Sequence, residues 1–146
     1  TQDNFIDVLE IKTPNTQLVS YDSHHHNYYL SPEVSKAVAQ AEKYIEQVAK
    51  KSLEIENYLT KTLKMPLGIV RPQGLILVGS DASLNKQADP EKARQDFRRL
   101  RVAYKDIKII TYTELLIGLR NRIAVLKRLI KPKATKSKVT KKSKKQ

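Results

Sequence analysis

Apolar and polar positions near the start of the chain follow the pattern of a β-strand. Residues 5–12 read FIDVLEIK, in which apolar and β-branched side chains dominate, and Pro14 ends the run. Successive side chains of a strand point to opposite faces. Alternation therefore predicts two sets of side chains: Val8, Glu10 and Lys12 on one face, and Asp7, Leu9 and Ile11 on the other.

The next regular pattern is helical and begins at Ser31-Pro32, a serine N-cap followed by a proline at the first helical position. Apolar residues then recur at three- and four-residue spacing, which predicts a helix with one core-facing stripe. The stripe consists of Val34, Ala37, Val38, Ala41, Ile45 and Val48. The helix either continues past Lys50 to about Leu59 or breaks near Ser52, and residues 65–68 end it. Residues 15–30, with three histidines and three tyrosines, have no clear period and are interpreted as a loop.

The second half of the chain alternates between strand and helix signals. A short apolar run between glycines predicts a strand buried on both faces, and Asp89-Pro90 and the capping-box spacing of TYTE predict two helix starts. The predicted elements are a strand at 74–79, a helix at 91–104, a strand at 107–110 and a helix from 111 to about 130. This order of elements favours an α/β domain with a central sheet.

Charge divides the chain into a mildly basic body and a strongly basic tail. The formal net charge is +13, and residues 131–146 contain eight lysines and no acid, so the body keeps about +5. We interpret 1–130 as the domain and 131–146 as a disordered tail, which either only solubilises the chain or holds DNA. A basic balance favours an anionic partner such as nucleic acid.

Three absences narrow the class of protein. The sequence contains no cysteine, so it has no disulfide, thiolate metal site or cysteine nucleophile. It also contains no long apolar run that would span a membrane and no secretion signal at its start. These features predict a cytoplasmic protein without a membrane partner.

The triplet Glu10-Ile11-Lys12 is the sharpest candidate for chemistry. A carboxylate and an ammonium two residues apart share one strand face, and Mg²⁺ prefers carboxylate and carbonyl oxygens as ligands. Glu10 and the carbonyl of Ile11 can bind the metal, while Lys12 activates water or offsets phosphate charge. Taken alone, such a triplet is more often a solvated strand face.

The predicted helix adds two polar side chains, Gln40 and Tyr44, which lie one turn apart at the edge of the apolar stripe. Either side chain can hold a metal-bound water or a phosphate oxygen. Taken alone, the pair is better explained as residues that flank a packed helix.

Together these motifs resemble the signature of RecB-like PD-(D/E)xK nucleases, with E-x-K on a strand and Q-x-x-x-Y on the next helix. The segments DVLEIKTPN, YYLSPEVSKAVAQAEKYI, RPQGLILVGSD, DFRRLR and TELL are similar, more narrowly, to Shedu anti-phage defence proteins over residues 5–119. The resemblance implies a restriction-endonuclease-like fold, with a central mixed sheet flanked by helices, and a Mg²⁺-dependent DNA nuclease.

The resemblance assigns roles to four residues: Glu10 as metal ligand, Lys12 as catalytic lysine, and Gln40 with Tyr44 as the helix pair. The family signature also needs an acidic residue on an earlier strand, and only nine residues precede Glu10. We expect that aspartate and the first elements of the fold upstream of Thr1, within a longer chain. Substitution by Asp7 would require a distorted strand.

Other candidates are weaker. His24, His25 and His26 can bind a transition metal, although an exposed loop with incidental metal affinity is favoured. Three arginines at 98, 99 and 101 either contact DNA phosphates or form a solvated helix face.

The competing function is a non-catalytic DNA-binding or assembly module. A homo-oligomer through the apolar stripe of the last helix is a further possibility, although such a stripe more often belongs to the domain's own core.

Overall fold

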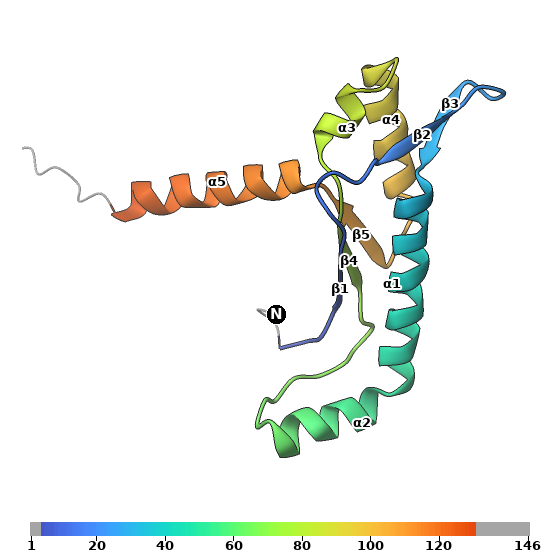
Figure 1. Ribbon diagram of the computed structural model, residues 1–146. Coiled ribbons are helices and arrows are strands. Elements are labelled where there is room, and N and C mark those ends of the chain that lie inside the picture. The colour runs from blue at the N-terminus through green and yellow to red at the C-terminus, as the bar shows by residue number, and fades with distance from the viewer. Residues whose placement is uncertain (1–3, 131–146) are drawn as a thin grey trace, which may run out of the picture.

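Three short parallel strands form the centre of the domain in the computed structural model, which describes residues 4–130 (Figure 1). Their order across the sheet is β1 (Val8–Ile11), β4 (Gly74–Leu77) and β5 (Ile107–Ile110). The register places Glu10 opposite Ile76, and Ile76 opposite Ile109. The predicted α/β class is confirmed, with helices flanking a small parallel sheet. The predicted lysine tail, residues 131–146, lies outside the described residues.

Helix α1 (Pro32–Lys50) lies along one face of this sheet and contacts all three strands. Ser31 caps it as predicted, since its hydroxyl accepts a hydrogen bond from the Val34 N–H at 3.2 Å. The helix breaks at Lys51, which confirms the earlier of the two predicted ends. It is followed by α2 (Ser52–Asn57) and a short π-helix, η1 (Tyr58–Thr62).

The segment interpreted as a loop contains a β-hairpin, so that prediction was wrong. Strands β2 (Val19–Asp22) and β3 (Asn27–Leu30) pair in antiparallel fashion (Figure 1). Each strand has only four residues and the turn contains no glycine, so the local pattern was too weak to detect. Tertiary contacts stabilise the hairpin: Tyr28 is buried, its N–H donates to Asp96, and its hydroxyl accepts from the Asp89 N–H.

Three helices fill the second half of the described chain: α3 (Asp81–Asn85), which the sequence did not predict, α4 (Pro90–Arg101) and α5 (Tyr112–Ile130). Helix α4 packs against β3, and it ends three residues before its predicted end. It begins as predicted, because the Asp89 side chain accepts from the Lys92 N–H at 3.0 Å.

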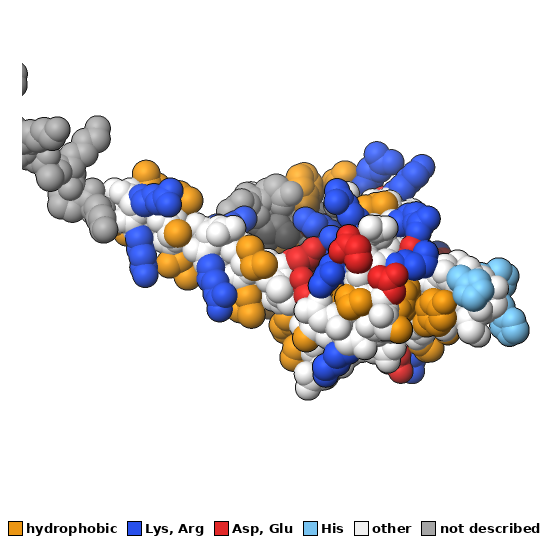
Figure 2. Space-filling view, turned by 90° about the horizontal axis from the view of Figure 1, so that it is seen from above, with side chains coloured by type: hydrophobic (Ala, Val, Ile, Leu, Met, Phe, Trp, Pro, Cys, Tyr) orange, Lys and Arg blue, Asp and Glu red, His pale blue; other side chains and the backbone are white. Residues whose placement is uncertain are grey.

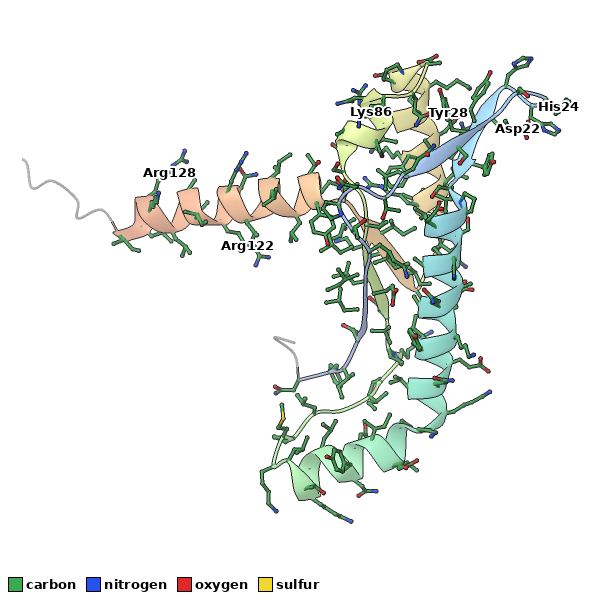
Figure 3. The ribbon with its side chains drawn as sticks, in the orientation of Figure 1. Asp22, His24, Tyr28, Lys86, Arg122 and Arg128 are labelled. Atoms are coloured by element: carbon green, nitrogen blue, oxygen red, sulfur yellow. The ribbon has the colours of Figure 1, made fainter. Side chains whose placement is uncertain are left out.

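Helix α5 projects away from the rest of the domain (Figure 1). None of its residues is buried, so the interpretation of its apolar stripe as part of the domain's own core was wrong. Arg122 and Arg128 extend from opposite sides of this helix (Figure 3). Within residues 4–130, no helix combines the length and hydropathy needed to cross a membrane.

The two faces of the sheet differ in exposure. The face toward α1 is buried, and Ile76 there is completely inaccessible to solvent. The opposite face is only partly covered by the described residues, since Leu9 and Ile11 are each 57% exposed and Leu75 and Leu77 are partly exposed. The prediction that the 74–79 strand is buried on both faces was therefore wrong for this part of the chain.

Candidate active site at the end of strand β1

Glu10, Lys12 and Gln40 meet where β1 ends beside α1. The Lys12 ammonium lies 2.8 Å from Oε1 of Glu10, and it donates to Oε1 of Gln40 at 2.9 Å. The side chains of Glu10 and Lys12 are only 17% and 29% exposed. The strand alternation predicted from the sequence brings Glu10 and Lys12 to the face that α1 covers. Gln40 comes from α1 and is 28 residues away from Lys12 in the sequence.

The backbone around Lys12 is fixed on two sides. Its N–H donates to the Leu77 carbonyl at 2.9 Å, which extends the pairing with β4. Its carbonyl accepts a hydrogen bond from the Tyr112 hydroxyl at 2.9 Å. Tyr112 is the first residue of α5, and sequence reasoning missed it because the two residues are 100 positions apart. The only local signal was its place at a predicted helix start.

The carbonyl of Ile11 points to the free edge of the sheet. In a parallel pair, alternate residues of a strand bond to a given neighbour. The N–H groups of Val8 and Lys12 bond to β4, so the backbone groups of Ile11 face the other way. Strand β1 is an edge strand in the described sheet. The Ile11 carbonyl therefore takes no part in the pairing between the described strands.

A cavity of about 550 Å³ adjoins this cluster. Its walls come from the end of β1, the turn that follows it, the first half of α1 and the start of α5. The lining residues are Ile11, Lys12, Thr13, Pro14, Thr16, Glu33, Lys36, Gln40 and Tyr112. Ile11 and Lys12 of E-x-K and Gln40 of Q-x-x-x-Y thus border this space, whereas Glu10 reaches it only through its contact with Lys12.

Two other acidic or polar candidates lie apart from this cluster. Tyr44 is 44% exposed and lies one turn beyond Gln40, and it does not line the cavity. Asp7 accepts a hydrogen bond from the Gln73 N–H at 3.0 Å. Asp7 thus contacts the backbone at the start of β4, and no described contact joins it to Glu10 or Lys12.

The three arginines of α4 differ in their environments. Arg101 forms an ion pair with Glu114 at 2.7 Å and stacks over the Phe97 ring. Arg99 forms an ion pair with the buried carboxylate of Asp96. Arg98 is exposed and forms no ion pair with any described residue. Of the three arginines predicted to contact DNA, Arg98 is therefore the one whose charge is not paired with another described residue.

The predicted histidine site lies at the tip of the β2–β3 hairpin, where Figures 2 and 3 show the His side chains away from the body of the domain. Asp22 holds this tip together. It accepts from the N–H groups of His24 and His25, and its carboxylate lies 2.9 Å from the His25 ring. These bonds, the His25 side chain first, lower the pKa of Asp22. Among the described residues, no three acidic, His or Cys side chains converge into a metal site.

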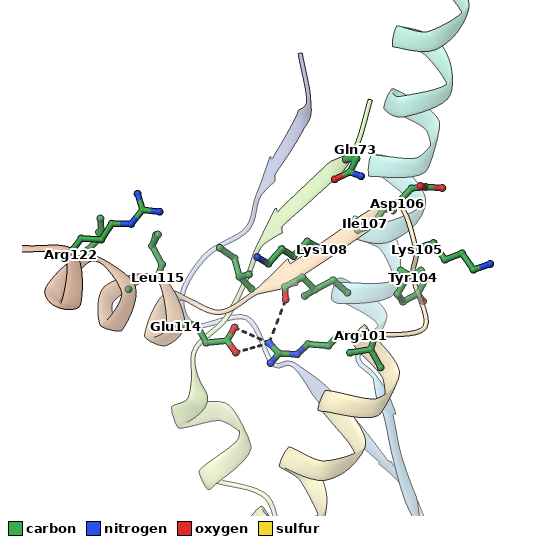
Figure 4. Close-up of a pocket in the computed structure, with 15 residues that line it drawn as sticks. Gln73, Arg101, Tyr104, Lys105, Asp106, Ile107, Lys108, Glu114, Leu115 and Arg122 are labelled. Carbon is green, nitrogen blue, oxygen red and sulfur yellow. Dashed lines mark hydrogen bonds and ion pairs between the residues drawn. The ribbon is translucent and has the colours of Figure 1, made fainter. Parts of the chain in front are cut away.

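A larger cavity, of about 970 Å³, lies beside β5 and the start of α5 (Figure 4). The ion pair between Arg101 and Glu114 crosses part of its wall, and Leu115 and Leu119 add apolar surface. None of the residues predicted to act in catalysis lines it. The smaller cavity beside Lys12 therefore remains the better candidate for chemistry.

Comparison with known proteins adds one positive result. The family described as "Shedu protein SduA, C-terminal" has a sequence model that matches residues 1–116. The match spans the sheet, α1 and the Glu10, Lys12 and Gln40 cluster, and it ends within α5. A comparison with curated proteins gave no match.

Proposed function

This chain belongs to the Shedu family, and on the basis of its match to the SduA C-terminal family model we propose that it is the Mg²⁺-dependent DNA nuclease domain of an anti-phage defence protein. We also propose that its small parallel sheet is the centre of a restriction-endonuclease-like, PD-(D/E)xK fold. The observation that carries the proposal is the placement of Lys12, which contacts both Glu10 and Gln40 beside an open cavity.

The donor set fits a hard cation. Glu10 uses Oε1 for Lys12, so its second carboxylate oxygen can bind a metal, and the Ile11 carbonyl lies at the adjacent free edge. Mg²⁺ is commonly bound by one or two carboxylates and completed by water and substrate phosphate oxygens. When bound there, Mg²⁺ would supply a Lewis acid for the scissile phosphate and lower the pKa of a bound water.

The remaining roles belong to the side chains around Lys12. Its ammonium has a third N–H beyond those directed at Glu10 and Gln40, and this N–H can hold the attacking water or stabilise charge on the phosphate. Gln40 fixes the direction of that ammonium. Tyr112 holds the Lys12 backbone through the hydrogen bond to its carbonyl. This restricts the movement of the Lys12 ammonium relative to the substrate.

The test is cleavage of plasmid DNA by the chain and by its longest natural form, with and without Mg²⁺. We expect Lys12→Ala and Glu10→Gln to lower the cleavage rate by at least about 100-fold, the scale of losing one electrostatic catalytic group. Lys43→Ala is the matched control, since Lys43 is an exposed lysine on α1 that lies outside the cavity. Equal rates for Lys12→Ala and the control would show that the catalytic assignment is wrong.

A second candidate function is a non-catalytic DNA-binding or assembly module. Two observations favour it. Glu10 is the single described carboxylate in direct contact with Lys12, and within residues 4–130 no three metal-binding side chains converge. Salt-dependent DNA binding by the longest natural chain, without Mg²⁺-dependent cleavage, would favour this function over the nuclease. Deletion of residues 131–146 would then report whether the lysine tail carries the binding.

A further inference from the structure

We propose that the cavity beside Lys12 is a phosphodiester-binding site in which Lys36, the Thr13–Thr16 hydroxyl pair and the Gln40 amide hold a DNA phosphate. This inference rests on the proposed function and extends it, because besides Gln40 it assigns substrate binding to Lys36, Thr13 and Thr16, which the nuclease motifs do not include. The argument comes from the hydrogen-bond donors that line the cavity and from their existing partners.

The turn after β1 presents a hydroxyl to the cavity. Thr13 and Thr16 close this turn, with the Thr16 N–H donating to the Thr13 carbonyl at 3.2 Å. Their hydroxyl oxygens lie 3.1 Å apart, so one hydroxyl donates to the other. The accepting hydroxyl keeps its own hydrogen. One O–H of the pair therefore stays available as a donor to a ligand.

Helix α1 contributes an amide and a cation. Gln40 uses its carbonyl oxygen to accept from Lys12, which leaves its NH₂ group, a double donor, without a partner among the described residues. Lys36 lies one turn before Gln40 and also lines the cavity. Although Glu33 is three residues away, Lys36 forms no ion pair with any described residue. Its charge is therefore available to an anionic ligand.

The charges around the cavity also favour an anion. Glu33 is the single carboxylate among the residues that line it, and Glu33 is exposed to solvent at its edge. Glu10 is not a lining residue, and its carboxylate is paired with Lys12. The Tyr112 hydroxyl is already used by the Lys12 carbonyl. What remains is a group of N–H and O–H donors around one space, which matches the acceptor oxygens of a phosphodiester.

The experiment measures binding of a fluorescent DNA duplex of about 20 base pairs by anisotropy, without divalent cation, between about 50 and 200 mM KCl. Loss of one phosphate contact to a lysine reduces the slope of log K against log salt by about 0.9. We expect this reduction, and several-fold weaker binding, for Lys36→Gln. Lys36→Arg should restore both. The double variant Thr13→Val, Thr16→Val should weaken binding without a change in slope, because hydroxyls carry no charge.

Lys43→Gln is the matched control, since it lies seven residues from Lys36 on the same side of α1 and outside the cavity. Equal slopes for the Lys36 and Lys43 variants, or a wild-type chain that does not bind the duplex, would overturn the phosphate site. Failure of the nuclease proposal has a different signature. In that case binding would keep its dependence on Lys36, while Mg²⁺ would produce no cleavage.

Discussion

Among the described glycines, Gly79 is the one whose replacement by alanine should destabilise the domain most. Gly79 follows β4 with φ of +57°, a conformation that residues with a Cβ rarely adopt. A Cβ built there would lie 2.6 Å from Cδ2 of Leu18 and 2.6 Å from the Thr16 carbonyl oxygen. Leu18 is completely buried and the Thr16 oxygen belongs to the backbone, so neither contact is relieved by a simple rotation.

Two costs determine the magnitude. The left-handed backbone costs a residue with a Cβ about 1–2 kcal/mol. Overpacking against a buried side chain typically costs a further ~1–3 kcal/mol. We therefore expect Gly79→Ala to lower the free energy of unfolding by roughly 2–5 kcal/mol. The turn that carries Thr16 would also shift, because the Gly79 N–H holds the Thr13 carbonyl at 3.1 Å.

The assay is equilibrium urea unfolding followed by circular dichroism, with Gly118→Ala as the matched substitution. Gly118 lies within α5, and a Cβ there meets no atom within 4 Å. Alanine at such an exposed helical position should stabilise by about 0.8–1.0 kcal/mol. The two substitutions are chemically identical and should have opposite signs. A Gly79→Ala variant that is as stable as the wild type would refute the close approach of β4 to the Thr13–Thr16 turn.

Two further predictions concern buried polar contacts. Burial raises the pKa of Asp96, but the Tyr28 N–H, Arg99 and Lys92 outweigh it and hold the pKa below its usual range. Its stabilisation is therefore fully present above the pKa of the unfolded chain and is lost as the pH falls through the folded pKa. Asp96→Asn should lower the unfolding free energy at pH 7 by about 1–3 kcal/mol and flatten its acid dependence, as measured by urea titration across pH. Tyr112→Phe removes the hydrogen bond to the Lys12 carbonyl, so the free energy of unfolding should fall by only about 0.5–1.5 kcal/mol. DNA cleavage should slow while DNA affinity stays unchanged. Unaltered cleavage would contradict the positioning role of Tyr112.

The candidate site was partly predictable because its first half is local. Residues 10 and 12 share a face on any regular strand, so the approach of Glu10 to Lys12 follows from backbone geometry. Residue 40 could be placed at the edge of the apolar stripe of α1, but its contact with Lys12 could not be predicted. That contact depends on how closely α1 approaches β1, which the packing of Val34, Ala37 and Ala41 determines.

The sequence by itself determined the elements whose signals are periodic or capped: the strand that carries E-x-K, the capped helices at Ser31 and Asp89, and the α/β class. Family membership also followed from the ordered motifs. These properties depend on neighbours within a few positions along the chain, where helix and strand geometry are fixed.

Tertiary structure alone decided the hairpin, the exposure of α5 and the role of Tyr112. Tyr28 is held in β3 by Asp96, 68 residues away, and Tyr112 reaches Lys12 across 100 residues. The apolar stripe of α5 has the same period whether it is buried or exposed, so its pattern carries no information about what covers it. Such outcomes depend on which distant surfaces meet, and hydrophobic periodicity does not encode the identity of the partner surface.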